Sequence, residues 1–132
     1  MKFKNGVPVI SKKHYKALCK SVKKWERILN GKDVDRAGKN CELCKRSDTD
    51  CNGCVVAYFD WNDSQILHVP DPVHSGCRNL GYSKWVAVAN TRISRDCSHF
   101  IYTINKQAYP YAVQIYDRLY AIMMTVEVEN GR

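Results

Sequence analysis

Apolar residues between Ser11 and Asn30 recur in steps of three and four positions, which is the spacing of one face of an α-helix. Ser11 is a favoured N-terminal cap, and Gly31 is favoured just after a helix end. The pattern therefore predicts an amphipathic helix over residues 11–30, preceded by an N-terminal segment over residues 1–10. The residues expected on its buried face are Tyr15, Leu18, Cys19, Val22, Trp25, Ile28 and Leu29.

A second amphipathic helix is predicted over residues 110–124. Pro110 suits the first turn of a helix, where its missing amide hydrogen would have no partner. Apolar residues follow it at helical spacing, namely Val113, Tyr116, Leu119, Tyr120 and Met123.

Short runs of β-branched and aromatic residues lie between these two helices. Residues 55–61 and 65–69 predict a hairpin around a polar turn, and residues 84–90 alternate weakly and predict another strand. The length of 132 residues is typical of one domain. We therefore expect a single α+β domain over residues 1–132, with the helices around a compact cysteine centre over residues 41–77.

The composition argues against several classes of protein. The apolar fraction of 45% is too high for a disordered chain, and no apolar run approaches the ~18 residues of a membrane span. The first residues lack the apolar core of a secretory signal. We expect a cytoplasmic protein with no membrane partner. Thiols stay reduced there, so the seven cysteines are expected to be metal ligands or free thiols.

The net charge of +8 is concentrated near the start of the chain. Residues 1–32 hold ten Lys and Arg against one acid, Glu26, and carry +9, whereas residues 33–132 carry −1. Such a cluster can contact nucleic-acid phosphates or an acidic protein surface, and it can also simply be solvated. Tyr15 and Trp25 belong to the apolar face, so the helix offers no aromatic ladder for single strands. The cations on the opposite face are Lys12, Lys13, Lys16, Lys20, Lys23, Lys24 and Arg27.

Two Cys-x-x-Cys pairs, Cys41/Cys44 and Cys51/Cys54, form the strongest chemical signal in the sequence. Each pair can place two thiolates of one turn on the same ion, and two pairs complete the tetrahedron that Zn²⁺ prefers. The six residues between the pairs are fewer than in a zinc ribbon, and Cys77 is an alternative ligand in place of one of the four. With four sulfur ligands the zinc would be structural.

Other interpretations of the cysteines have less support. The pattern lacks the Cys-x2-Cys-x2-Cys run of a bacterial ferredoxin and the βαβ context of a redox motif. An arrangement without zinc is kept as an alternative. Cys19 lies on the apolar face of the first helix and Cys97 belongs to no motif, so both are expected in the core.

The order of these motifs resembles a family of small cysteine-rich proteins encoded by bacteriophages and prophages. The resemblance covers roughly residues 24–85 and implies a phage origin and a metal site, without implying an activity. Small phage proteins often bind a host enzyme, a defence complex or nucleic acid. The motifs are Lys24-Trp25-Glu26-x-Ile28-Leu29-x-Gly31, Asn40-Cys41-x-Leu43-Cys44, Asp50-Cys51-x-Gly53-Cys54, Gly76-Cys77 and Tyr82-x-x-Trp85.

We therefore expect a zinc-binding, non-enzymatic phage protein in the cytoplasm of the bacterial host. Its lysine-rich helix would bind either nucleic acid or a host protein that acts in nucleic-acid processing or in defence. Homo-oligomerisation is left open.

Two other functions are kept as alternatives. His74, Asn90 and His99 follow the His…Asn…His order of HNH-like ββα-metal nucleases, although Val73 precedes His74 where those nucleases commonly have an acidic residue or histidine. A sponge or sensor for a nucleotide signal is the second alternative. Its pocket would form by oligomerisation, because the sequence has no glycine-rich loop to cradle phosphates.

The purified protein is expected to contain one zinc ion per chain, because four thiolates bind Zn²⁺ tightly at neutral pH. Elemental analysis and native mass spectrometry measure the stoichiometry. Cys→Ser changes at Cys41, Cys44, Cys51, Cys54 and Cys77 should lower the zinc content wherever the sulfur is a ligand. Cys19→Ser makes the same chemical change on the helix and should leave it unchanged. A folded protein without metal would contradict the prediction.

Overall fold

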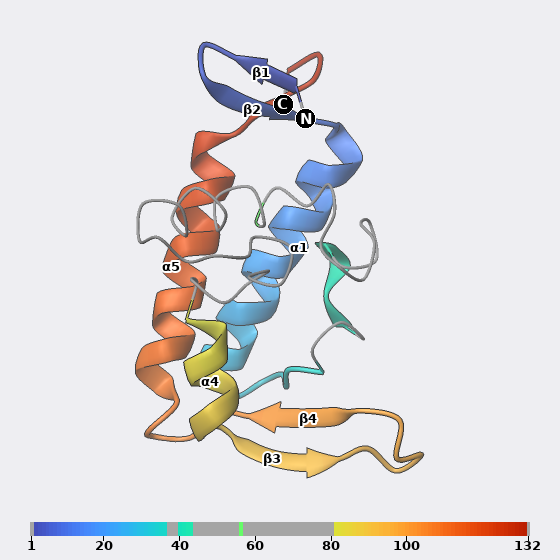
Figure 1. Cartoon of the computed structure of the whole chain (residues 1–132), viewed down its shortest axis with the longest axis vertical. Coiled ribbons are helices and arrows are strands. Elements are labelled where there is room, and N and C mark those ends of the chain that lie inside the picture. Colours follow the sequence, from blue (N-terminus) through green and yellow to red (C-terminus); the bar gives the residue numbers. More distant parts are fainter. Residues whose placement is uncertain (1, 37–39, 44–55, 57–80, 132) are drawn as a thin grey trace, which may run out of the picture.

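Two long helices form the centre of the fold (Figure 1). Helix α1 (Lys12–Leu29) and helix α5 (Tyr109–Thr125) lie side by side and run in opposite directions. A shorter helix, α4 (Tyr82–Val88), packs against α5. The computed structural model describes residues 2–36, 40–43, 56 and 81–131. Within these residues the chain is a mixed α+β protein with three helices and two small sheets.

The boundaries predicted for the two long helices are confirmed. Ser11 caps α1, and its hydroxyl oxygen accepts a hydrogen bond from the N–H of His14 at 3.1 Å. After the C-terminal cap Asn30, Gly31 has a φ of +73°, the left-handed conformation that commonly ends a helix. Pro110 lies in the first turn of α5.

A small sheet joins the two ends of the chain. Strands β1 (Lys2–Lys4) and β2 (Val7–Ile10) form an antiparallel hairpin whose turn, Asn5-Gly6, has positive φ at both residues, 53° and 78°. Asn-Gly is the favoured dipeptide for such a turn, because asparagine and glycine tolerate this conformation. Strand β5 (Glu127–Val128) then pairs in parallel with β2, and the sheet order is β1-β2-β5.

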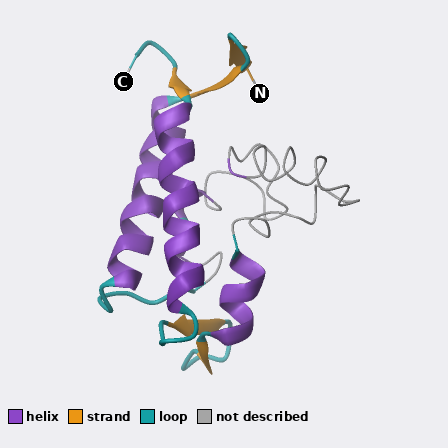
Figure 2. Ribbon diagram, turned by 90° about the vertical axis from the view of Figure 1, so that its left-hand side faces the viewer, coloured by secondary structure: helices purple, strands orange, loops and turns teal. Residues whose placement is uncertain are grey.

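A second hairpin lies at the opposite end of the helix pair (Figure 2). Strands β3 (Asn90–Ile93) and β4 (Phe100–Thr103) pair in antiparallel register, with Asn90 opposite Thr103 and Ile93 opposite Phe100. This hairpin follows α4 directly and precedes α5, so it connects two elements that pack on each other.

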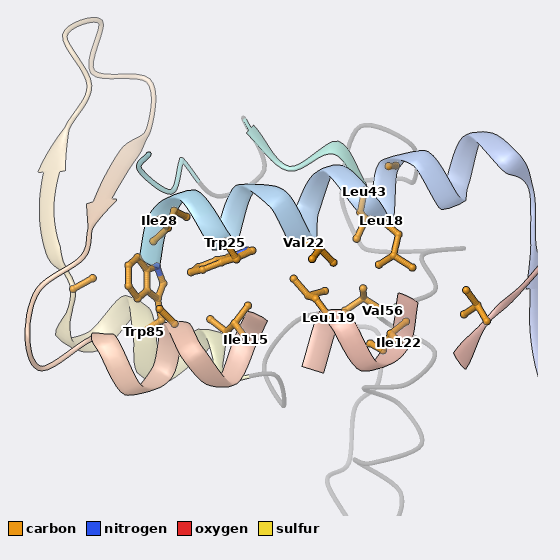
Figure 3. Packing of buried hydrophobic residues seen from close by; sticks show 14 of the residues in the cluster. Leu18, Val22, Trp25, Ile28, Leu43, Val56, Trp85, Ile115, Leu119 and Ile122 are labelled. Carbon is orange, nitrogen blue, oxygen red and sulfur yellow. The ribbon is translucent and has the colours of Figure 1, made fainter. Parts of the chain in front are cut away.

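The core lies between α1 and α5 (Figure 3). All residues predicted on the apolar face of α1 are buried or half-buried, so that face is confirmed. Trp85 is fully buried at the hairpin end of the core, and Leu43 and Val56 add to it from the middle of the chain. The buried residues labelled in Figure 3 are Leu18, Val22, Trp25, Ile28, Leu43, Val56, Trp85, Ile115, Leu119 and Ile122.

The buried face of α5 matches the predicted one in part, because Val113, Tyr116 and Met123 are half-buried. Leu119 is buried as expected, but Tyr120 is 45% exposed. The side that contacts the rest of the core includes Ala112, Ile115 and Ile122. The helix is apolar over a wide arc, and the small side chain of Ala112 lets this side approach its neighbours closely, which the sequence pattern alone does not indicate.

The strand predicted over residues 84–90 is wrong, because most of this segment is helix α4. Tyr82, Trp85, Val86 and Ala89 recur at helical spacing and all are buried or half-buried. The hairpin predicted over residues 55–69 lies outside the described residues, except that Val56 is buried and has helical backbone. None of the helices described is both long and apolar enough to span a membrane.

Leu18→Ala should lower the free energy of unfolding by about 2–5 kcal/mol, because it leaves a cavity in the core between the two long helices. Met124→Ala, a truncation at a position that is 57% exposed on α5, is the control and should change it by less than about 0.5 kcal/mol. Urea denaturation measures both. If the two variants lost the same free energy of unfolding, a core centred on the helix pair would be contradicted.

Candidate functional site

The exposed side of α1 carries a row of cations, which we call the cationic face. It runs over about 22 Å at 1.5 Å per residue. The helix contains one acidic residue, Glu26, and none in its first turn. The cationic face comprises Lys12, Lys13, Lys16, Lys20, Lys23 and Arg27, which are all exposed.

The five lysines of the cationic face have no ion-pair partner among the residues that the structure describes. Arg27 differs, because its Nη2 lies 2.8 Å from Oδ2 of Asp33. Partial burial raises the pKa of Asp33, but the hydrogen bonds from Arg27 and from the N–H of Val34 outweigh burial and hold that pKa below its usual value. Asp33 is therefore charged at neutral pH and holds the guanidinium in place.

Lys24 does not lie on the exposed face, so that part of the prediction is wrong. The residue is only 6% exposed, and its Nζ donates to Oδ1 of Asp35 at 2.9 Å. Ser21 and Ile28, three positions before it and four after it, are also buried. Lys24 is therefore at the border of the inward face, where a carboxylate from the connector after α1 compensates its charge.

Asp35 joins four parts of the chain. Its carboxylate accepts hydrogen bonds from Nζ of Lys24 at 2.9 Å, the hydroxyl of Tyr82 at 2.8 Å and Nε1 of Trp85 at 3.0 Å. Its backbone pairs with that of Tyr102 in β4 through two hydrogen bonds of 2.9 and 2.8 Å. Because a buried carboxylate is costly unless it is paired and hydrogen-bonded, these donors stabilise it.

Aromatic rings surround this ion pair. Trp25 meets Trp85 edge to face at a centroid distance of 5.1 Å and Tyr82 at 6.4 Å, and Nζ of Lys24 lies 5.4 Å from the Trp25 centroid. Lys24 and Asp35 have side-chain exposures of 8% and 1%, which leaves little surface for a ligand to touch. We therefore assign the cluster a structural role, which is to fix the connector, α4 and β4 against α1.

A groove of about 340 Å³ lies between α1 and the connector that follows it. Lys20 and Lys23 reach it from the cationic face, whereas the charges of Lys24 and Arg27 are balanced by their paired aspartates. The groove therefore continues the cationic face toward the connector. Its lining residues are Lys20, Lys23, Lys24, Arg27, Asp33, Asn40 and Glu42.

The predicted zinc centre over residues 41–77 stays a prediction. Cys41 is half-buried against the core. The other candidate ligands, Cys44, Cys51, Cys54 and Cys77, lie outside the described residues. Within the part of the chain that is described, no three His, Cys, Asp or Glu side chains form a group that could hold a metal ion.

The residues of the nuclease alternative do not converge among those described. Asn90 and His99 lie at opposite ends of the β3–β4 hairpin, about 13 Å apart along the strand at about 3.3 Å per residue. Asn90 accepts a hydrogen bond from Asn105 at 3.0 Å, and the ring of His99 is held between Ser98 and Arg36. His74 lies outside the described residues.

The two cysteines predicted in the core have different environments. Cys19 is half-buried, and its Sγ lies 3.7 Å from Sδ of Met123. Cys97 is exposed in the β3–β4 loop with a φ of 58°, so its predicted core position is wrong. The loop is held by the hydroxyl of Ser94, which donates to Asp96 and accepts from the N–H of Ser98. The Cys97 thiol takes part in neither of these hydrogen bonds.

In the part of the chain that is described, the fold and the site define a small α+β protein with a cationic helix face. Comparison with protein-family models, curated proteins and solved structures finds no match to this chain. The function is therefore argued from the site itself.

Asp35→Asn should lower the free energy of unfolding by about 3–5 kcal/mol, because it leaves the Lys24 ammonium buried without a counter-charge. Adding Lys24→Met should restore part of the loss, because the double variant buries no charge. Asp33→Asn removes the partner of a more exposed pair and should cost less than about 1 kcal/mol. Urea denaturation compares the variants, and equal costs for Asp35→Asn and Asp33→Asn would disprove the structural role.

Proposed function

We propose that this protein is a non-enzymatic nucleic-acid-binding protein of phage type, whose cationic face contacts the phosphate backbone. The observation that carries the proposal is the row of five exposed lysines without ion-pair partners among the described residues. A polyanion supplies the counter-charges that this row lacks. We place its action in the cytoplasm of a bacterial host.

The cationic face is costly for the helix itself. Lys12 and Lys16, Lys16 and Lys20, and Lys23 and Arg27 are like-charged neighbours at a spacing of four residues, and each such pair is unfavourable by about 0.2–0.5 kcal/mol.

The helix dipole adds to this cost. Lys12 and Lys13 lie in the first turn, where the dipole favours acidic residues. Bound phosphates would relieve both penalties.

A second candidate function rests on the groove beside the cationic face. Its volume of about 340 Å³ is at the lower end of small-ligand sites, and two lysines face it without a paired acid among the described residues. This favours the alternative of a sponge or sensor for a nucleotide signal. Asp33 and Glu42 also line the groove, and their negative charges weaken its attraction for a free nucleotide.

Replacing Lys16, Lys20 and Lys23 by Glu should weaken binding to nucleic acid at least about tenfold near 0.1 M salt, because each lysine is expected to neutralise one phosphate. The slope of log affinity against log salt should become shallower by about one for each phosphate that is no longer neutralised. Fluorescence anisotropy with a random duplex and a random single strand, measured at several salt concentrations, gives both quantities.

The matched control replaces Lys84, Lys106 and Arg118 by Glu. These three residues are exposed outside α1, and the change in net charge is the same. An equal loss of affinity in the control would mean that only overall charge matters and would contradict the assigned face. If the wild-type protein shows no salt-dependent binding to nucleic acid, nucleic acid is excluded as the ligand and a protein partner remains. Divalent-dependent nicking that disappears with His74→Ala would contradict a non-enzymatic function.

A further inference from the structure

The end of the β3–β4 hairpin exposes an apolar pair. Ile93 and Phe100 are cross-strand partners and are 52% and 56% exposed. The next pair along the ladder is Arg92 and Ile101, and Ile101 is 2% exposed and points into the core. Because side chains alternate along a strand, Ile93 and Phe100 share the outward face, where an antiparallel hairpin normally carries polar residues.

One arginine lies beside this apolar pair. Arg95, in the loop after β3, is exposed and has no ion-pair partner within the described part of the chain. Arg92 is also exposed, but it lies on the other face of the ladder, opposite Ile101. The acidic residue of this loop is Asp96, whose carboxylate is hydrogen-bonded within the loop. It accepts hydrogen bonds from the hydroxyls of Ser94 at 2.6 Å and Ser98 at 2.7 Å. We call Ile93, Arg95 and Phe100 the hairpin tip.

The loop that carries the hairpin tip is pre-organised. The hydrogen bonds from Ser94 and Ser98 hold the pKa of Asp96 well below its usual range, so this carboxylate keeps its place in the loop at neutral pH. The N–H of Ser94 donates to the carbonyl of His99 at 2.9 Å, which closes the loop. A loop that is already ordered loses little entropy when it binds a ligand.

The β3–β4 hairpin and the cationic face lie on the same side of α1. The β3–β4 hairpin projects past α1 on the side away from α5 (Figures 1 and 3), which is also the side that the exposed face of α1 looks toward. Arg36, in the connector after α1, lies 3.2 Å from Nε2 of His99. The pairing of Asp35 with Tyr102 joins the same connector to β4.

We propose that the hairpin tip contacts unpaired nucleobases, so that the nucleic acid bound by this protein is single-stranded where it meets the hairpin. Phe100 stacks on a base, Ile93 packs against its edge, and Arg95 contacts an adjacent phosphate. The cationic face of α1 follows the backbone beyond the hairpin. This inference rests on the proposed function and identifies the class of nucleic acid.

Single-stranded nucleic acid fits the hairpin tip better than the alternatives. An apolar pair has no donors or acceptors to read base edges in a duplex groove, whereas an exposed ring can stack on any unpaired base. The surface area of two apolar side chains is also far smaller than the ~800 Å² that each partner buries in a standard protein interface. The neighbouring guanidinium of Arg95 matches a polyanion.

Phe100→Ala should weaken binding to oligo(dT) of about 16 nucleotides by about 5- to 150-fold, the range expected for the loss of one stacked base. The affinity for a duplex of the same length should change less than about twofold, and the salt slope should be unchanged because no charge is removed. Phe100→Trp should keep the wild-type affinity, because tryptophan also stacks. Fluorescence anisotropy at several salt concentrations measures the affinity and the salt slope of the wild type and of both variants.

Tyr120→Ala is the matched control, because it removes an exposed aromatic ring of α5 that lies outside the hairpin tip. Circular dichroism and thermal melting verify that the variants fold. If Phe100→Ala binds oligo(dT) like the wild type while the lysine variant fails, the hairpin contact is disproved and the proposed function stands. Equal weakening for single strand and duplex would also disprove stacking. A wild type that binds neither would overturn both proposals.

Discussion

The buried ion pair between Lys24 and Asp35 is the contact on which the arrangement of the other elements depends. Asp35 comes from a polar connector that has little apolar surface to hold it in place, yet its carboxylate and backbone bind α1, α4 and β4 at once. A buried carboxylate requires donors in fixed positions, so this residue specifies where the neighbouring elements lie. The apolar core lies between α1 and α5, and the ion pair links the connector, α4 and β4 to α1.

This arrangement separates the two faces of α1. One face supplies the core, and the border residue Lys24 supplies the ion pair. The remaining cations stay in solvent, apart from Arg27, which Asp33 holds. The same connector that carries Asp35 also positions the β3–β4 hairpin through Tyr102 and His99. The cationic face and the β3–β4 hairpin therefore keep a fixed relation, which the proposed composite surface for nucleic acid requires.

Local signals in the sequence are sufficient to predict some elements and too weak for others. The first helix carries a cap, a stop and an unbroken apolar stripe, so its predicted bounds match α1. Asn5-Gly6 is an equally local signal for the β1–β2 hairpin, where only an N-terminal segment is predicted. Residues 84–90 fit a weak alternation as well as a helix, and the burial of Trp85 against Trp25 selects the helix.

The sequence by itself determined the two long helices, the apolar face of α1 and the concentration of positive charge on the opposite face, because helical periodicity and charge are local properties. The tertiary structure decided which lysine is buried, which side of α5 contacts the core and which side chains the hairpin exposes. Those outcomes depend on contacts between residues far apart in the chain, such as Asp35 with Trp85 and Tyr102. Nothing in the local pattern around Phe100 marks it as exposed, because its environment is set by where β4 meets the rest of the fold.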